Sequence, residues 1–227
     1  MANFEVIKEN WQHQIIICED GSHTLYVPHL EEHYHSVHGA VNESMHVFIQ
    51  MGLQHHSGKN INILEVGFGT GLNALLTLVS AHEKTIYYHT IEKYPLDIEL
   101  ASQLNYGNYL QGCADLYPQF HHSSWEEDVA LTSNFILHKT KADFRAVELI
   151  KKYDLVYFDA FAPSKEPDLW QIDVFANIFR QMNTNGILVT YCAKGSVRRM
   201  LTEVGFFVER LPGPPGKREM LRAIRLV

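Results

Sequence analysis

Apolar runs alternate with helix-like stretches along the chain from about residue 60 onwards. Short apolar segments bounded by turn residues are typical of buried strands, whereas apolar positions three or four residues apart indicate helices. We expect strands at residues 62–66, 85–91, 135–138, 153–158, 187–191, 206–211 and 220–226. We expect helices at 72–82, 95–104, 144–151, 170–182 and 196–204.

This alternation predicts an α/β fold with a mostly parallel, doubly wound sheet. The sheet should have seven strands, of which the last, after the PGPPG turn at 212–216, runs antiparallel to the others. Residues 4–27 are predicted to form a separate β-hairpin, because two apolar runs flank a Glu-Asp-Gly-Ser turn. We therefore expect an N-terminal part at 1–58, with the hairpin and a connecting helical segment, and a main domain at 59–227. The aromatic segment 105–130 has no clear pattern.

Composition supports a folded intracellular chain. Its 227 residues are 46% hydrophobic and 20% charged, which favours a packed core of one sizeable domain, alone or with a small appendage. The longest uncharged stretch, 66–82, contains three glycines and is shorter than the roughly 20 apolar residues of a membrane helix, and no secretory signal opens the chain. Three scattered cysteines exclude a disulfide framework or a CxxC zinc site and suit the cytoplasm.

The charge is unevenly distributed along the chain. The net charge of −7 combines −12 in residues 1–190, where 11 Lys and Arg face 23 Asp and Glu, with +5 in residues 191–227, where 8 face 3. Such asymmetry indicates a nucleic-acid surface, and the alternative is a solvated basic tail on an acidic body.

A glycine turn joins the first expected strand of the main domain to its first helix. Glycines permit positive φ and let a ligand approach the backbone, and ligands bind at the carboxyl ends of parallel strands. The spacing is GxGxG rather than the GxGxxG of dinucleotide folds, which suits a nucleoside without pyrophosphate; a purely structural turn is the alternative. The candidate cofactor-binding residues here are Glu65, Gly67, Gly69, Thr70, Gly71 and Asn73.

Three more acidic residues end successive strands. Glu92 could accept both ribose hydroxyl hydrogens, or it could be a surface residue paired with Lys93. Asp143 could accept from an adenine amino group, or cap the helix expected after it. Asp159 ends an apolar strand, where burying a charge for stability alone would be costly. Acidic groups at four strand ends, counting Glu65, predict a ligand crevice.

Several stretches, taken together, resemble a known family. They are LEVGFGTGLN (64–73), DAFAPSKEPDLW (159–170), SVRRMLTEVGF (196–206) and KREML (217–221). Over roughly residues 24–225 the chain resembles the S-adenosylmethionine (SAM)-dependent methyltransferase domain of the enzymes that make 5-methylaminomethyl-2-thiouridine at the tRNA wobble position. The stretch 36–44, which contains Glu43, resembles the segment before the methyltransferase core of that family.

The resemblance implies a Rossmann-like SAM methyltransferase fold, SAM as cofactor and the anticodon loop of tRNA as partner. The implied reaction is N-methylation of an aminomethyl group on the wobble uridine, giving 5-methylaminomethyl-(2-thio)uridine. Familiar members carry a C-terminal FAD-dependent oxidase that first removes a carboxymethyl group. This chain ends at Val227, so we expect a separate oxidase or an upstream modification enzyme to supply its substrate. The PGPPG loop departs from the family's glycine-and-basic version, which affects the expected RNA contacts.

Residue roles follow from this reading. An alkylamine is mostly protonated at neutral pH, so a carboxylate must accept its proton, and Asp159 is the expected catalytic base. The expected substrate pocket consists of Glu43, Phe161 and Pro163. The expected phosphate contacts are Lys194, Arg198, Arg199, Lys217 and Arg218.

Two other functions stay open at this point. A small-molecule amine transferase of the polyamine-synthase type would share the fold and the acidic residues, and would need no basic surface. A non-catalytic SAM-fold scaffold for a tRNA-modifying complex is the second alternative. The 14 histidines lack the spacing of a metal site, so we expect no metal, and we expect no membrane partner.

Overall fold

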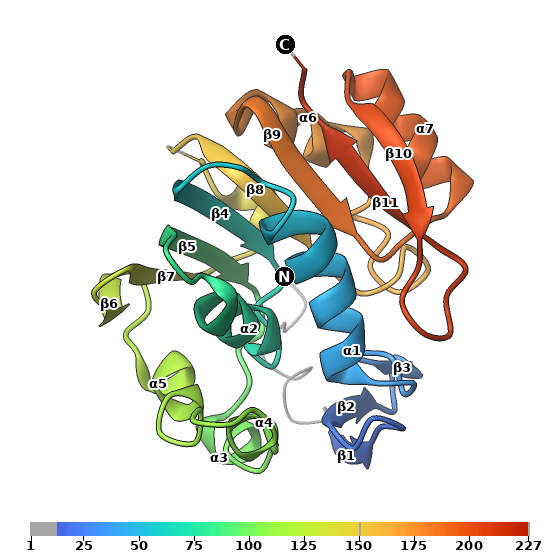
Figure 1. The fold of residues 1–227 in the computed structure, drawn as a ribbon. Coiled ribbons are helices and arrows are strands. Elements are labelled where there is room, and N and C mark those ends of the chain that lie inside the picture. Colours follow the sequence, from blue (N-terminus) through green and yellow to red (C-terminus); the bar gives the residue numbers. More distant parts are fainter. Residues whose placement is uncertain (1–12, 150, 227) are drawn as a thin grey trace, which may run out of the picture.

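The computed structural model describes residues 13–149 and 151–226, and these residues form one main sheet with helices on both faces (Figure 1). Within this part of the chain the sheet has eight strands in the order β10-β11-β9-β8-β4-β5-β7-β6. Their bounds are β4 (Asn60–Val66), β5 (Thr85–Glu92), β6 (Asp128–Thr132), β7 (Phe135–Lys141), β8 (Tyr153–Phe158), β9 (Met182–Thr190), β10 (Phe207–Pro212) and β11 (Glu219–Ile224).

The five central strands, β7, β5, β4, β8 and β9, are parallel. Strand β11 is antiparallel to both β9 and β10, as expected for the last strand. The expectation of seven strands is wrong by one, because β6 pairs antiparallel with β7 at the edge of the sheet. This strand begins in the unassigned segment 105–130, its five residues are all half-buried or exposed, and its apolar run is only three residues long.

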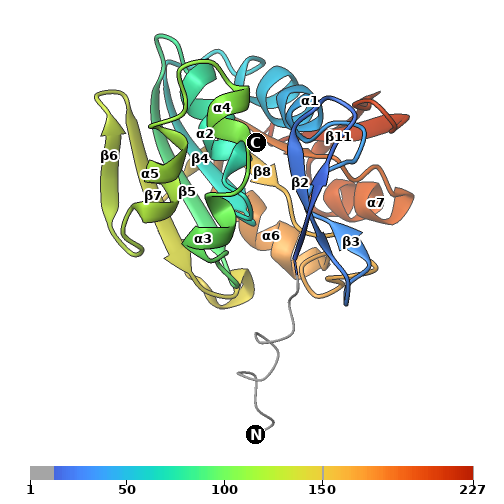
Figure 2. The ribbon, with the colours of Figure 1, turned by 90° about the horizontal axis from the view of Figure 1, so that it is seen from below.

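Alternate residues of the central strands belong to two hydrophobic cores, one on each face of the sheet. Ile63 and Tyr157 face the core beneath η2 (Met45–Leu53, a π-helix) and α2 (Leu72–Ser80), with α1 (Ala40–Ser44) leading into η2. Leu64 and Val156 face the opposite core, beneath α6 (Ile172–Gln181) and α7 (Gly195–Val204). Figure 2 shows α2 and α6 on opposite sides of the sheet. The layers follow from the two-residue period of side chains along a strand.

A second, three-stranded antiparallel sheet precedes the main fold. It consists of β1 (Gln14–Ile17), β2 (His23–Val27) and β3 (Glu32–His33). Its first two strands match the later part of the expected hairpin, and residues 4–7 of that hairpin lie outside the described residues. Leu25 of β2 belongs to the same core as α2. The small sheet is thus packed onto the main one.

Several expected helices are shorter than their sequence pattern. The expected helix at 144–151 is wrong: only a 3₁₀ turn, η3 (Phe144–Ala146), forms, and the backbone is extended at Val147. The helix expected at 95–104 is reduced to α3 (Ile98–Ala101). The unassigned segment contains α4 (Tyr106–Tyr109) and α5 (Tyr117–His122). Among the described residues, no helix is long and apolar enough to cross a bilayer.

Candidate cofactor and active site

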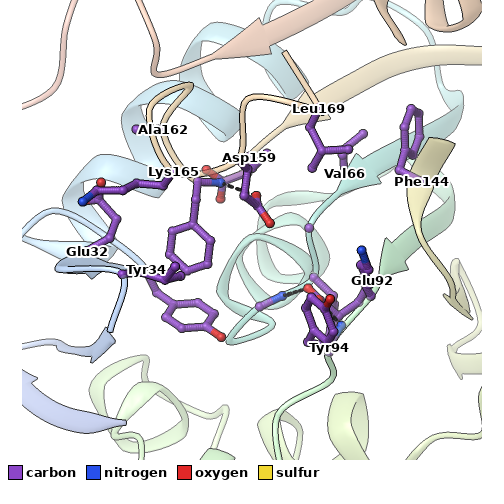
Figure 3. A pocket seen from close by; sticks show the side chains of 18 of the residues that line it. Glu32, Tyr34, Val66, Glu92, Tyr94, Phe144, Asp159, Ala162, Lys165 and Leu169 are labelled. Atoms are coloured by element: carbon purple, nitrogen blue, oxygen red, sulfur yellow. Dashed lines mark hydrogen bonds between the residues drawn. The ribbon is translucent and has the colours of Figure 1, made fainter. Parts of the chain in front are cut away.

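A cavity of about 750 Å³ opens at the carboxyl ends of the parallel strands. Its lining comes from the glycine turn after β4, from the ends of β5, β8 and β9, and from the loop after β8. Residues 29–37 of the N-terminal sheet region close it from the other side. Figure 3 shows Asp159 and Glu92 facing this space from their strand ends, with Tyr34 across from them.

The glycine turn lies against the backbone of the neighbouring strand end. Gly67 has φ +91°, and a Cβ there would lie 3.0 Å from the carbonyl oxygen of Asp159. Gly69 has φ +49°, and a Cβ there would lie 3.0 Å from the Tyr34 ring. A side chain at either position would therefore displace a cavity wall. Gly71, at φ +72°, caps α2 and is not part of the lining.

Three side chains from distant parts of the chain hold Thr70 in the middle of this turn. The hydroxyl of Thr70 lies 2.8 Å from His35 Nε2. Its carbonyl oxygen accepts from the Tyr117 hydroxyl at 2.9 Å and from His121 Nε2 at 3.1 Å. Burial lowers the pKa of both histidines to about 4, so they are neutral at physiological pH. Sequence analysis missed all three contributors.

Glu92 has the position expected of a ribose ligand. Its carboxylate accepts from the Gly69 amide at 3.0 Å and from the Tyr94 amide at 2.7 Å, and it lines the cavity. The alternative of a pair with Lys93 does not hold, because Lys93 bonds to Asp143 instead, at 2.9 Å. A carboxylate has about four acceptor positions, so two remain for a ligand.

Asp143 has the capping role that the sequence offers, and it also lies at the cavity. It lines the cavity, and its side chain caps η3 by accepting from the Arg145 amide at 3.1 Å. Hydrogen bonds from the Arg145 guanidinium, together with Lys93, hold its pKa well below the usual range. This carboxylate is ionised at any physiological pH.

Asp159 lies between the glycine turn and the loop after β8. Its Oδ2 accepts from Asn73 Nδ2 at 2.7 Å. Burial raises the pKa of Asp159 to about 7, whereas the Asn73 bond lowers it. Glu43 raises it further and Lys217 lowers it. A carboxyl group with this pKa can both take and release a proton near neutral pH.

Glu43 and Lys217 meet in the lining of the cavity. Glu43 Oε1 lies 2.5 Å from Lys217 Nζ, and Oε2 accepts from the Ser36 amide at 2.7 Å. Lys217 Nζ also lies 4.0 Å from the centre of the Tyr191 ring. Both charged residues line the cavity. Lys217, which the sequence suggests as a phosphate contact, is therefore engaged inside the site.

Aromatic residues form the wall next to Asp159. The rings of Phe161 and Tyr34 meet edge-to-face at 5.1 Å, and both line the cavity. Pro163, expected beside Phe161, lies in the same loop but is not part of the lining. Glu166, which the sequence analysis did not single out, lines the cavity and accepts from the Phe161 amide at 3.1 Å. Burial raises its pKa to about 7.

Two expected cofactor residues lie behind the cavity rather than on its surface. Asn73, on α2, is 3% exposed and reaches Asp159 as described. Glu65 is fully buried, and burial raises its pKa to about 8. Neither lines the cavity. The other expected phosphate contacts, Lys194, Arg198, Arg199 and Arg218, are exposed. No group of side chains in the described ranges could hold a metal ion.

Comparison with known proteins decides the family. Residues 105–225, more than half of the chain, match a family described as S-adenosyl-L-methionine-dependent methyltransferase. The chain belongs to this methyltransferase family.

Its relatives include bifunctional proteins. The chain is 32% identical over 89% of its length to the tRNA 5-methylaminomethyl-2-thiouridine biosynthesis bifunctional protein MnmC of Burkholderia multivorans (strain ATCC 17616 / 249). It is 33% identical over 90% of its length to the protein of that name from Cupriavidus metallidurans (strain ATCC 43123 / DSM 2839 / NBRC 102507 / CH34). It spans 33% of the length of each.

A solved structure has the same fold. The crystal structure of MNMC2 from Aquifex aeolicus superimposes with a TM-score of 0.78 and 26% identity, covering 96% of this chain and 71% of that one. The expected Rossmann-like methyltransferase fold and the family resemblance are confirmed.

The cavity of this methyltransferase fits its cofactor. SAM carries a positive sulfonium and an ammonium group, and it is a nucleoside without pyrophosphate. Glu92 has acceptor positions free for ribose hydroxyls at the glycine turn. The carboxyl groups of Glu43, Asp159 and Glu166 add acidic character to the lining. An acidic cavity attracts a cationic ligand.

Proposed function

We propose that this chain transfers a methyl group from SAM to the primary amine of an aminomethyl group on the tRNA wobble uridine, giving 5-methylaminomethyl-(2-thio)uridine. The names of the relatives support the substrate class. The observation that carries the proposal is Asp159, a carboxyl group that lines the cavity beside the glycine turn and whose pKa burial raises to about 7.

Bound SAM supplies an electrophilic methyl group, so the chain's task is to present a neutral amine. An alkylammonium has no lone pair for the attack and must first lose a proton. Asp159 can accept this proton because its own pKa is about 7 and the Asn73 amide stabilises the ionised carboxylate. As the new N–C bond forms, the bond from the methyl carbon to sulfur breaks and S-adenosylhomocysteine leaves as a neutral thioether. The methylated nitrogen then gives up its excess proton to solvent, or to Asp159 once this carboxyl group has released the first proton to solvent.

The cavity also suits a nucleobase. It is deep enough that a base must leave the anticodon stack to enter, which costs little in a single-stranded loop. The Phe161 and Tyr34 rings offer an apolar wall of the kind on which flipped bases stack. The exposed Arg198 and Arg199 of α7 provide positive charge for phosphates.

Mass spectrometry of wobble nucleosides tests the proposal in cells with the gene, without it, and with the gene carrying Asp159→Asn. We expect the unmethylated aminomethyl-uridine to accumulate in the second and third strains. An unchanged nucleoside profile in the deletion strain would contradict the proposal. A change in methylated polyamines instead would favour a small-molecule amine transferase, which the acidic cavity could also serve.

A further inference from the structure

Behind the cavity lies a group of buried polar atoms that the proposed reaction does not use. Both carboxyl oxygens of Glu65, the Asn73 Oδ1, the Tyr88 hydroxyl and the Thr90 hydroxyl are buried without a hydrogen-bond partner among the described residues. Thr90, Tyr88 and Asn73 are nonetheless close enough to influence the titration of Glu65. Unpaired buried polar atoms are rare in native proteins and call for a reason.

The Asn73 amide acts on two carboxyl groups, the fully buried Glu65 and the half-buried Asp159 at the cavity. Asn73 Nδ2 donates to Asp159 Oδ2 at 2.7 Å, whereas Glu65 has no donor in hydrogen-bonding geometry. Glu65 is 0% exposed, so its charged form would be both unsolvated and unpaired. Hydrogen bonds to a carboxylate favour ionisation, and burial opposes it. A negative charge on Asp159 raises the pKa of Glu65, which disfavours ionisation of both together.

We propose that Asn73 is a positioning residue that assigns the single negative charge of this carboxyl pair to Asp159 and leaves Glu65 as a neutral acid. The catalytic part of this inference rests on the proposed function, because Asp159 must be ionised to accept a proton from the substrate amine. Glu65, which the sequence suggests as a cofactor-binding residue, is then the neutral member of a pair of carboxyl groups.

The charged surroundings agree with this assignment. Asp159 also faces Glu43 from α1, which raises its pKa, and Lys217 from the loop before β11, which lowers it. No cation among the described residues acts on Glu65. Burial and Asp159 both raise its pKa, and the neighbouring Thr90, Tyr88 and Asn73 only partly offset this. The negative charge is therefore better stabilised on Asp159.

Replacement of Asn73 tests the proposal through the pH profile of methyl transfer. Without its amide, the pKa of Asp159 rises, so the acidic limb of kcat moves to higher pH, by roughly one pH unit for one lost hydrogen bond to a charged group. Asn73→Ala keeps a good helix former in α2, and Asn73→Leu keeps more of the buried volume if the smaller residue unfolds the chain. The control is Thr77→Val one turn later, which loses a bond to the Asn73 carbonyl but not the amide contact.

An unmoved limb in a folded Asn73 variant, or an equal shift in Thr77→Val, would overturn the proposal.

A second measurement does not depend on activity. Carbon-13 NMR of side-chain carboxyls in the full chain without ligand should show a carboxyl that titrates at higher pH than Asp159 and Glu166, near pH 8, and is lost in Glu65→Gln. The Asp159 signal, assigned by Asp159→Asn, should titrate at higher pH in Asn73→Ala. Titration of Glu65 in the ordinary acidic range would refute the charge assignment. If the wild-type chain methylates no tRNA while the NMR result holds, the proposed function fails and the pairing stands.

Discussion

The cavity and the outer surface around α7 differ in charge and in how their charged groups are held. Carboxyl groups in the cavity, such as the buried Glu43 and the half-buried Asp159, are fixed by hydrogen bonds. Arg198 and Arg199 on α7 are exposed. Buried groups change pKa and can do proton chemistry, whereas exposed cations act through long-range, salt-screened attraction. The comparison separates chemistry from RNA binding.

Lys217 is where the two regions meet. It belongs to the basic C-terminal segment, yet its ammonium pairs with Glu43 and lines the cavity. Its side chain is 34% exposed, and its ammonium already has the Glu43 carboxylate as a partner. We therefore assign it to the cavity in the experiments below and leave it out of the surface variants.

Asp159→Asn should have the largest effect. The amide keeps the shape but cannot accept a proton from an ammonium, so turnover should fall roughly 10²–10⁴-fold, the usual contribution of general-base catalysis. SAM and tRNA affinities should change little. For the wild type, kcat should fall as the pH drops below about 7, because the base becomes protonated. The deficit of the variant should shrink at high pH, where more substrate amine is already neutral; full activity would remove Asp159 from the role of base.

Glu92→Ala should come next, with an effect on cofactor affinity. It removes acceptors for the ribose and also the bond to the Gly69 amide. We expect SAM binding to weaken by about 1–3 kcal/mol in calorimetry. Glu83→Ala, an exposed carboxylate before β5, is the matched control and should leave the affinity unchanged. A loss well below tenfold for Glu92→Ala would mean that other groups hold the ribose.

Removing the charges of Arg198 and Arg199 together should act on RNA alone. The apparent KM for tRNA should rise severalfold, and the slope of its logarithm against log salt should flatten by roughly 1–2, since about one counterion is released per phosphate contact. SAM affinity should not change. The control removes the charges of Lys151 and Lys152, two exposed residues that directly precede β8. They lie at the end of this strand that is opposite to the cavity. Equal effects of the two pairs would contradict a specific RNA surface on α7.

The smallest effect concerns stability. The pKa of Glu65 is raised by burial to about 8 from 4.5, so the folded chain binds more protons than the unfolded chain between these values. The free energy of unfolding therefore falls as the pH rises through this window. Glu65→Gln should make this fall smaller. The Tm of the variant minus that of the wild type should therefore be larger at pH 8 than at pH 5, by about 2–4 °C for each kcal/mol. Parallel Tm curves for variant and wild type would show that Glu65 is ionised at little cost.

Local patterns predicted the centre of the site. The glycine turn and the acidic strand ends follow from apolar strands of the right length, so Glu92 and Asp159 fall at the carboxyl edge without knowledge of distant contacts. Strand β6 was missed because it is an edge strand without a buried residue, and its run of three apolar residues is too short to stand out.

The remaining contacts are long-range and leave no local signal. His35 and Tyr117 reach Thr70 across 35 and 47 residues. Lys217 reaches Glu43 across 174 residues, and a lysine in a basic segment gives no hint of a buried partner. Such pairs depend on how the elements pack, which hydrophobic periodicity does not specify.

The central claim is that the acidic cavity methylates an amine carried by tRNA. The most direct test incubates the purified chain with SAM labelled on its methyl group and tRNA containing 5-aminomethyl-2-thiouridine, followed by nucleoside mass spectrometry. We predict one labelled methyl group on the aminomethyl nitrogen of the wobble nucleoside, formed by the wild type and much more slowly by Asp159→Asn. Label on another nucleoside, or none on tRNA under conditions where SAM binds, would contradict the account.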